Sequence, residues 1–217
     1  MKTARVKICG ITSKHDLMTA VDAGADAVGF VVDVPSSARN LTLDVAEKLV
    51  KLVPVFVNSI AVTVSESLGS LKRIYEQVKP DGMQIHGEKF PQAHVIREGI
   101  PHTHLIKAIN PEPGDIVESS LKASRSFDAV LLDSYVRGKY GGTGIVHNWE
   151  LSRHIRDRLN STPLILAGGL TPDNVEEAIR IVHPYAVDVS SGVESCPGVK
   201  DSRKVFEFVM NAKKVRF

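Results

Sequence analysis

The sequence predicts an α/β protein that folds as a single (β/α)8 TIM barrel, with eight parallel strands, over residues 1–217. Short apolar runs rich in β-branched residues alternate along the chain with longer segments of helical periodicity. Eight such pairs take roughly 27 residues each, which is enough for one strand, one helix and two short loops. The strand segments are apolar throughout, as in parallel sheets that helices cover.

The predicted strands are short apolar runs, several of which end on a polar or small residue. They cover residues 6–9, 27–32, 60–64, 82–86, 104–109, 129–133, 163–169 and 186–192. Between them, Ser13 is a good N-cap for the first helix, and Gly24 ends it. An apolar stripe defines the helix at 43–53, whereas the pattern at 90–98 is weaker. The predicted helices cover residues 13–24, 43–53, 70–78, 90–98, 115–123, 148–159, 171–182 and 201–214.

Two helix starts offer two candidate caps each. The helix within 171–182 begins at Asp173 or Asn174. The last helix begins at Asp201 or Ser202, and it carries lysines in its final turn, where they interact favourably with the helix dipole. Both segments therefore have helix boundaries that the sequence itself marks.

Eight strictly alternating strand–helix units favour a closed barrel. The alternative is an open, doubly wound sheet, which usually has fewer strands and a glycine-rich G-x-G-x-x-G loop after its first strand. Here the loop after the first strand reads CGITS. The longest loops are expected at 32–42 and 134–147.

Composition excludes several classes of protein. With 43% hydrophobic residues and a net charge of +2, from 27 Lys+Arg against 25 Asp+Glu, the chain is too apolar to be disordered, and a nucleic-acid partner is not expected. Two cysteines cannot build a disulfide scaffold. No apolar run approaches the ~20 residues of a membrane span, and the N-terminus lacks the features of a signal peptide. We therefore expect a cytoplasmic protein with no membrane partner.

Active sites of such barrels lie at the C-terminal ends of the strands. The polar residues expected there are Lys7, Cys9, Asp33, Arg39, His86, Lys107, Asp133, Asp188, Ser190 and Ser191. The glycines expected there are Gly141, Gly142, Gly168, Gly169 and Gly192.

Glycine-rich loops after the seventh and eighth strands commonly bind phosphate in barrel enzymes. LAGGL contributes Gly168 and Gly169, and VSSGVE contributes Gly192 with two hydroxyls. Backbone amides in such loops can hold a phosphate without a cationic side chain. The alternative is that these glycines only make tight turns. The loop with Gly141 and Gly142 could fold over a ligand as a lid.

The side-chain candidates each have a structural alternative. Cys9 is either a small buried hydrophobe or a reactive thiol. Asp133 either caps the following loop or acts as an acid or base. Arg39 is a solvated residue unless a ligand carboxylate meets it, and His86 is more often structural than catalytic. Neither cysteine sits in a metal-binding cluster, so no metal is expected, and a disulfide to Cys196 is disfavoured in the cytosol.

Six motifs together resemble the phosphoribosylanthranilate isomerase family, and they occur in order along the whole chain. They are VKICGIT, GADAVGFV, QIHGE, LLDS with YGGTG, LAGGL followed by P and NV, and AVDVSSGVE. The combination of KICGIT with DVSSGVE is the specific part, because other phosphate-binding barrels share the glycine loops but not this pair.

The resemblance implies an Amadori rearrangement of N-(5-phosphoribosyl)anthranilate to 1-(2-carboxyphenylamino)-1-deoxyribulose 5-phosphate, in tryptophan biosynthesis. It implies Cys9 as general base, Asp133 as general acid, and Arg39 as the contact of the anthranilate carboxylate. The loops after strands six, seven and eight would surround the phosphate. No cofactor is expected, because the aniline nitrogen is the electron sink, and the assembly would be a monomer or homodimer. The full expected set of substrate-binding residues is Lys7, Arg39, His86, Gly141, Gly142, Gly168, Gly169, Asp188, Ser190, Ser191 and Gly192.

The chain departs from the family pattern in two places. Asp33 stands near a position that is often aromatic, although Ser37 and Arg39 are kept. Thr63 and Ser65 stand where the family often has Phe and Asn. Neither change removes a residue assigned to proton transfer.

Rival functions make different demands on the sequence. Aminoaldose isomerases of histidine synthesis would have an aspartate where this chain has Cys9. Indole-glycerol-phosphate synthase would have catalytic lysines and a long N-terminal extension. A non-catalytic phosphosugar-binding barrel would be favoured if Cys9 or Asp133 were missing, and both are present.

Overall fold

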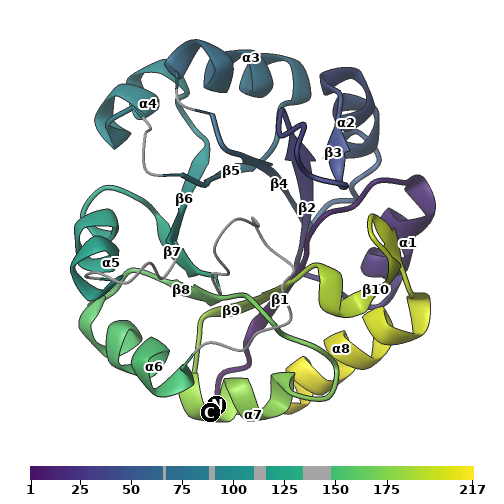
Figure 1. The fold of residues 1–217 in the computed structure, drawn as a ribbon, viewed down its shortest axis with the longest axis vertical. Helices are drawn as coiled ribbons and strands as arrows, with labels where there is room; N and C mark the ends of the chain where they lie inside the picture. The colour runs from purple at the N-terminus through teal and green to yellow at the C-terminus, as the bar shows by residue number, and fades with distance from the viewer. Residues whose placement is uncertain (66, 88–90, 110–115, 134–147) are drawn as a thin grey trace.

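A computed structural model of the chain describes residues 1–65, 67–87, 91–109, 116–133 and 148–217. Eight parallel strands close into a barrel in the order β1-β2-β4-β5-β6-β7-β8-β9, and β9 pairs back to β1 (Figure 1). Helices surround the strands on the outside, as Figure 1 shows. The predicted (β/α)8 fold is confirmed.

The barrel strands lie close to their predicted positions. They are β1 Arg5–Ile8, β2 Ala27–Val32, β4 Asn58–Thr63, β5 Gly82–Ile85, β6 His104–Ile109, β7 Ala129–Leu132, β8 Leu164–Leu166 and β9 Ala186–Val189. Three residues predicted as strand ends, Cys9, His86 and Asp133, lie one position beyond their strands. The N–H of Cys9 still donates to the carbonyl of Val189, at 2.8 Å.

The helices also match the predicted segments. They are α1 Lys14–Asp22, α2 Leu43–Val50, α3 Leu68–Val78, α4 Ala93–Gly99, α5 Ile116–Ser124, α6 Trp149–Arg158, α7 Val175–Val182 and α8 Ser202–Lys214. Ser13 caps α1 by accepting the N–H of Asp16, and Asp201 caps α8 by accepting the N–H of Lys204. Asn174 is the residue before α7, but its side chain makes no cap bond.

The core has two layers, which follow from the alternation of side chains along each strand. On β1, Val6 and Ile8 pack outward against the helices, and both are completely buried. Cys9 belongs instead to a smaller cluster inside the barrel, together with Ile60 and Leu131. The side chains of Lys7 and Cys9 therefore point into the barrel, below and at its mouth.

Four short elements were not predicted. Asn40–Leu41 forms β3 beside β2, inside the segment predicted as a loop. After β9, a 3-10 turn at Ser191–Val193 leads into an antiparallel hairpin of β10 Glu194–Cys196 and β11 Val199–Lys200. Strands of two or three residues are too short to show a periodicity, so the sequence pattern gave no sign of them.

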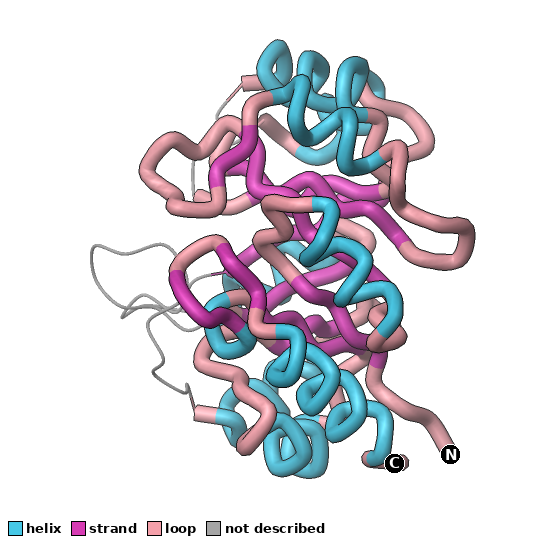
Figure 2. The backbone as a smooth tube through the Cα atoms, turned by 90° about the vertical axis from the view of Figure 1, so that its right-hand side faces the viewer, coloured by secondary structure: helices cyan, strands magenta, loops and turns pink. Residues whose placement is uncertain are grey.

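The two ends of the chain meet on one side of the barrel, as Figures 1 and 2 show. Lys2 and Phe217 exchange backbone hydrogen bonds of 2.7 and 3.0 Å. None of the helices in the described ranges is long and apolar enough to cross a bilayer.

Candidate active site

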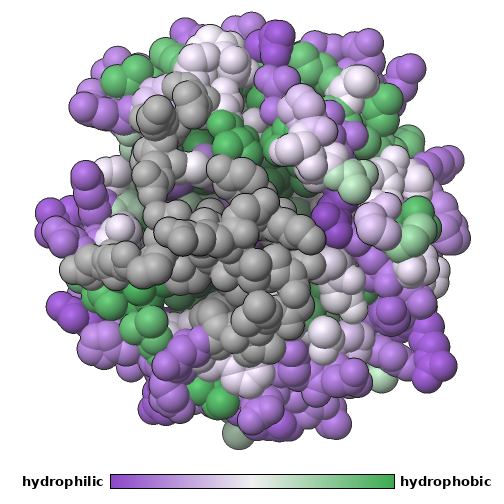
Figure 3. Space-filling model, in the orientation of Figure 1, coloured by the Kyte–Doolittle hydropathy of each residue, from purple (hydrophilic) through white to green (hydrophobic). Residues whose placement is uncertain are grey.

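The C-terminal ends of the barrel strands surround a cavity. Figure 3 views the chain from the same side as Figure 1 and shows mostly hydrophilic residues around the outer edge of the molecule. The cavity gathers most of the residues that the sequence analysis assigned to a site: Cys9, Arg39, His86, Asp133, Gly168, Gly169, Asp188, Ser190, Ser191 and Gly192. Lys7 lies beneath them inside the barrel, 3% exposed. Gly141 and Gly142 fall outside the described residues, and the lid predicted there does too.

Lys7 and Asp188 form a buried ion pair across neighbouring strands. The register of β1 on β9 sets these two residues side by side, and the Lys7 Nζ lies 2.9 Å from the Asp188 Oδ2. Burial alone would lower the pKa of Lys7, but the Asp188 carboxylate and the Cys9 sulfur outweigh burial and raise it. The other carboxylate oxygen, Oδ1, is buried and has no hydrogen-bond partner within the described structure.

Cys9 lies next to this ion pair on the same face of β1. Burial raises the pKa of its thiol, and the Asp188 charge acts in the same direction, while the ammonium groups of Lys7 and Lys200 oppose the shift. A glycine on β2 makes room for it, because a Cβ at Gly29 would lie 2.7 Å from the Cys9 Sγ and 3.1 Å from the Lys7 Cε. The thiol is thus enclosed by backbone on one side and a cation on the other.

Gln84 and His86 extend the ion pair across the barrel. Lys7 has only donors, so Gln84 accepts its Nζ through Oε1, at 2.9 Å. The Gln84 amide nitrogen then donates to the Nε2 of His86, at 2.8 Å, which places the ring proton on Nδ1. Burial, with the charges of Lys107 and Lys7, lowers the pKa of His86 to about 3. His86 is therefore neutral at physiological pH and offers one N–H as a donor.

Lys107, also expected at a strand end, has a structural role. Its Nζ donates to the carbonyl oxygens of Ile85, Gly87 and Ala108 at 3.2, 2.7 and 2.8 Å. The buried ammonium group of Lys107 fixes the end of β5, which His86 follows. Its positive charge disfavours protonation of the His86 ring.

Arg39 reaches the cavity from the segment between β2 and β3, where Glu194 holds it. Its Nε and Nη2 donate to the two carboxylate oxygens of Glu194 at 2.7 and 2.6 Å. The Arg39 chain lies directly over Gly10, where a Cβ would stand 2.5 Å from the Arg39 Cδ. Gly10 also has a φ of +74°, so both its backbone and its surroundings require glycine.

The loops after β8 and β9 touch each other at the cavity. A Cβ at Gly192 would lie 1.9 Å from the carbonyl oxygen of Leu170, so only glycine fits there. Gly168 and Gly169 both have positive φ angles, +81° and +66°. Asn174 braces the first loop, since its amide donates to the Gly169 carbonyl at 2.9 Å and its oxygen accepts the N–H of Thr171 at 2.8 Å. The Asn174 oxygen, which was predicted to cap α7, is therefore bonded to the N–H of Thr171 instead.

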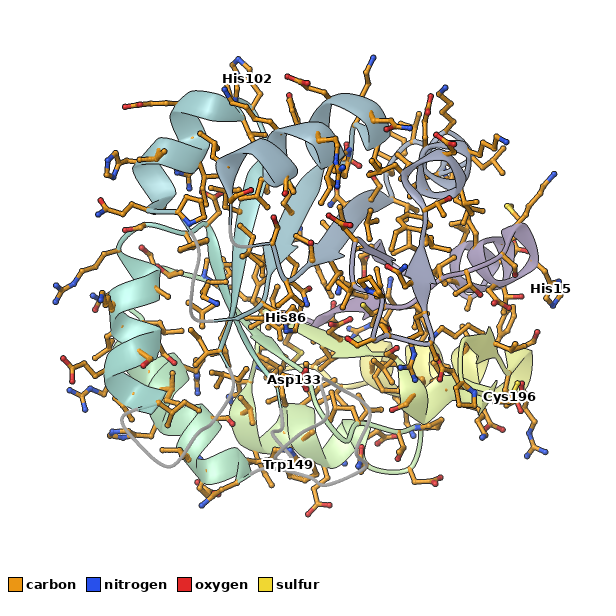
Figure 4. The ribbon with its side chains drawn as sticks, turned by 45° about the horizontal axis from the view of Figure 1, so that its top comes forward. His15, His86, His102, Asp133, Trp149 and Cys196 are labelled. Atoms are coloured by element: carbon orange, nitrogen blue, oxygen red, sulfur yellow. The ribbon has the colours of Figure 1, made fainter. Side chains whose placement is uncertain are left out.

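Asp133 follows β7, and its N–H donates to the carbonyl of Ile109 at 3.2 Å. Figure 4 shows Asp133 and His86 near the middle of the barrel, whereas Cys196 lies at its edge. Both cysteines are free. Asp33 does not join the site: it has a φ of +59° and pairs with Arg73 on the exterior, at 3.0 Å.

A second cavity, of 510 Å³, lies at the opposite end of the barrel. It is lined by residues before the strands, such as Lys79 and Asp81, and by first residues of strands, such as His104. It contains none of the predicted site residues, and it lies away from the strand ends where barrel enzymes carry their chemistry. The cavity at the mouth is therefore the candidate active site.

Comparison with known proteins identifies the family of this chain. The family model described as N-(5'phosphoribosyl)anthranilate (PRA) isomerase matches residues 6–211. A curated relative of that name from Methanothrix thermoacetophila is 44% identical over 206 residues, covering 94% of this chain and 96% of its own. The chain belongs to this isomerase family.

Solved structures of phosphoribosyl anthranilate isomerase have the same fold. The enzyme from Thermotoga maritima superposes with a TM-score of 0.86 at 36% identity, over 98% of this chain and all of its own. Another crystal structure, in complex with reduced 1-(o-carboxyphenylamino)-1-deoxyribulose 5-phosphate, gives a TM-score of 0.82, also at 36% identity, with the same coverage of each chain.

Sequence reasoning missed three residues in or directly beside the candidate site: Gln84, Glu194 and Lys200. The first two stand inside motifs that carried the family resemblance, QIHGE and DVSSGVE, but nothing in those motifs names their partners. Lys200 is completely buried on the unpredicted hairpin, and no local pattern marks it. Within the described ranges, no group of three or more metal-ligating side chains is present.

Proposed function

We propose that this protein converts N-(5-phosphoribosyl)anthranilate to 1-(2-carboxyphenylamino)-1-deoxyribulose 5-phosphate, a step of tryptophan biosynthesis. Family membership supports an isomerase of this name. The observation that carries the assignment to residues is that Cys9, Asp133, Arg39 and the two glycine loops line one cavity. The proposal therefore rests on one cavity that holds a pair of groups for proton transfer, a cation for a carboxylate and loops for a phosphate.

The two ends of the substrate match different walls of the cavity. The phosphate would lie against the loops 168–170 and 190–192, whose glycines give close access to backbone N–H groups. The anthranilate carboxylate would meet the guanidinium of Arg39. With both ends fixed, the ribose lies between Cys9 and Asp133, and the hydroxyls of Ser190 and Ser191 and the Nδ1–H of His86 are available to its oxygens.

Ring opening comes first in the proposed mechanism. The carboxylic acid of Asp133 protonates the ring oxygen as the C1–O bond breaks, and the lone pair of the aniline nitrogen forms the C1=N bond of an iminium ion. Asp133 is left as a carboxylate. General acids in such positions contribute typically 10²–10⁴-fold to a rate.

Proton abstraction from C2 follows. The thiolate of Cys9 takes the C2 proton, and the electrons of that bond form the C1=C2 bond of an enolamine as the iminium nitrogen becomes neutral. The enolamine tautomerises to the ketone when the C2 hydroxyl loses its proton and C1 gains one. No metal or organic cofactor takes part in these steps.

The surroundings of Cys9 act on its thiol in both directions, and their net effect is to raise the pKa of the thiol. Burial raises the pKa of the thiol, whereas Lys7 beside it favours the anion. Asp188 holds Lys7 in place at 2.9 Å. The positive charge of the iminium ion adds to that of Lys7, so the thiolate is favoured most when the C2 proton must leave.

We expect the enzyme to act in the cytoplasm, as a monomer or homodimer built from one barrel domain. A solved structure describes monomers generated from the dimeric enzyme of Thermotoga maritima, which is 34% identical to this chain. Gel filtration with light scattering decides between the two states here.

The decisive test generates phosphoribosylanthranilate in situ and follows its fluorescence. The proposal expects the fluorescence to disappear at a rate proportional to the protein concentration. No change, beside a positive control with an established isomerase, would overturn the proposal. Binding of the reduced product analogue without turnover would instead support the rival of a non-catalytic phosphosugar-binding barrel.

A further inference from the structure

Arg39, Glu194 and Lys200 form one chain of ion pairs under the edge of the cavity. Both carboxylate oxygens of Glu194 accept hydrogen bonds from Arg39, and one of them also accepts a hydrogen bond from the Nζ of Lys200, at 2.9 Å. The side chains of Arg39, Glu194 and Lys200 are 16%, 5% and 0% exposed. Charges buried to this degree are stable only with close partners of opposite charge, which these three residues provide for one another.

The way Glu194 binds leaves part of Arg39 available. A guanidinium carries five N–H donors in a plane, and Glu194 takes one from Nε and one from Nη2. The opposite edge, formed by Nη1 and the second hydrogen of Nη2, is a fork that matches a second carboxylate. Arg39 lines the cavity, so a ligand carboxylate can reach this edge.

The charges of the three residues do not cancel. Two cations meet one carboxylate, which leaves one positive charge in a largely buried group. One ligand carboxylate would balance it.

Lys200 also connects this group to the loop after β9. Its Nζ donates to the carbonyl oxygen of Ser190 at 3.1 Å. On the other side, the Nζ of Lys204 donates to the backbone carbonyl of Glu194 at 2.9 Å. Glu194 is thus held through its backbone and through its carboxylate. Because its position is fixed, it also fixes the guanidinium of Arg39.

We propose that Glu194 is a positioning residue that presents the outer edge of Arg39 to an aromatic carboxylate, while Lys200 supplies the unbalanced positive charge. Glu194 and Lys200 thereby select substrates that carry the carboxyl group over those that lack it. This inference rests on the proposed function, since it assigns the carboxylate end of the same ligand.

The test compares two probes that differ only in the carboxyl group. They are reduced 1-(o-carboxyphenylamino)-1-deoxyribulose 5-phosphate and the corresponding phenylamino compound, each titrated by calorimetry so that turnover is not needed. Glu194→Gln should weaken the carboxylated probe by about tenfold or more, because an amide has only one oxygen to accept from Arg39 and no longer fixes its outer edge, while the phenylamino probe keeps its affinity within about twofold.

Two further variants complete the design. Glu194→Asp keeps the charge but shortens the side chain, so it should weaken the carboxylated probe by a smaller factor and again spare the other. Glu207→Gln is the matched control, because Glu207 pairs with Arg203 on the exposed side of α8. It should leave both affinities unchanged.

The outcomes separate the two proposals. Equal weakening of both probes by Glu194→Gln and Glu194→Asp would show a merely structural role and overturn the inference. Unchanged affinity for the carboxylated probe would overturn it as well. If the wild-type protein turns over phosphoribosylanthranilate, such results refute only this inference. A wild-type protein without turnover refutes the proposed function itself.

Discussion

Two groups of buried charges lie at the mouth of this barrel, and they are built differently. The strand group consists of Lys7, Cys9, Gln84, His86 and Asp188, which come from β1, β5 and β9 or directly follow those strands. The loop group consists of Arg39, Glu194 and Lys200, which come from a loop and the hairpin β10–β11.

The two groups also differ in charge. In the strand group, Lys7 and Asp188 cancel, and the remaining members are a thiol, an amide and a neutral imidazole. The loop group retains one positive charge. A balanced group beside a thiol suits proton transfer, whereas an unbalanced one suits the capture of an anion. Under the proposed function, the strand group would take part in proton transfer and the loop group would bind the carboxylate of the substrate.

The largest effect expected concerns turnover. Cys9→Ala and Asp133→Asn should each lower kcat by roughly 10³-fold, within the 10²–10⁴ that general acids and bases contribute. The fluorescence assay measures it, with the circular dichroism spectrum as a check of the fold. Cys196→Ala, at the exposed cysteine, is the matched control and should keep full activity. Near-wild-type turnover in either variant would remove the role assigned to that residue.

The next effect concerns stability. Asp188→Asn leaves the ammonium of Lys7 buried without its carboxylate, and the free energy of unfolding should fall by about 3 kcal/mol. Urea unfolding measures it, with the exposed pair variant Glu207→Gln as control, for which a change under about 0.5 kcal/mol is expected. An unchanged urea midpoint would show that the pair contributes nothing.

The same pair predicts a pH dependence. The pKa of Lys7 is raised in the folded state. Its contribution to stability is therefore complete below the ordinary lysine pKa and is lost as the pH rises through the folded-state value. Alkaline titration should destabilise the wild type above about pH 10.4, and Asp188→Asn should show less of this loss.

In the loop group, Arg39→Ala should raise KM for the anthranilate substrate by roughly 10–100-fold, since a charged hydrogen bond contributes about 1.5–3 kcal/mol. The effect on kcat should be smaller, because Arg39 neither donates nor accepts a proton in the proposed mechanism. Arg73→Ala is the control, since it removes an exposed arginine that pairs with Asp33. A KM equal to that of the wild type would refute the carboxylate contact.

The contrast between the groups also explains what could be predicted from the sequence. Lys7, Asp188 and His86 lie on or next to strands, so the rule that sites lie at the C-terminal strand ends located them before any contact was known. Their pairing follows from register, because β1 and β9 are neighbours only in a closed barrel. The fold and the strand group were thus largely predictable.

The loop group was not predictable in the same way. Arg39 was singled out, yet its partner Glu194 lies 155 positions away on a three-residue strand. Lys200 is on a two-residue strand. Elements this short carry no periodic signal, and the contact depends on the close approach of Arg39 to Gly10, which only three-dimensional packing reveals.

The smallest expected effect is a change in stability at acidic pH, and its measurement tests whether the His86 ring in the strand group is neutral. The pKa of His86 is lowered to about 3, so between pH 6.5 and 3 the unfolded chain binds a proton that the folded protein does not. Stability should therefore fall as the pH drops, by up to about 1.4 kcal/mol per pH unit, and by about 1.6 kcal/mol in total between pH 6.5 and 5.

His86→Gln keeps an acceptor for the amide of Gln84 but cannot titrate, so its urea midpoint should stay flat over this range while that of the wild type declines. His15→Gln makes the same substitution on α1, at the periphery of the barrel, and should keep the wild-type slope (Figure 4). Equal slopes for the wild type and His86→Gln would mean that His86 accepts a proton in the folded state. In that case the amide of Gln84 could not donate to Nε2, and the chain of hydrogen bonds from Asp188 through Lys7 would have to end at Gln84.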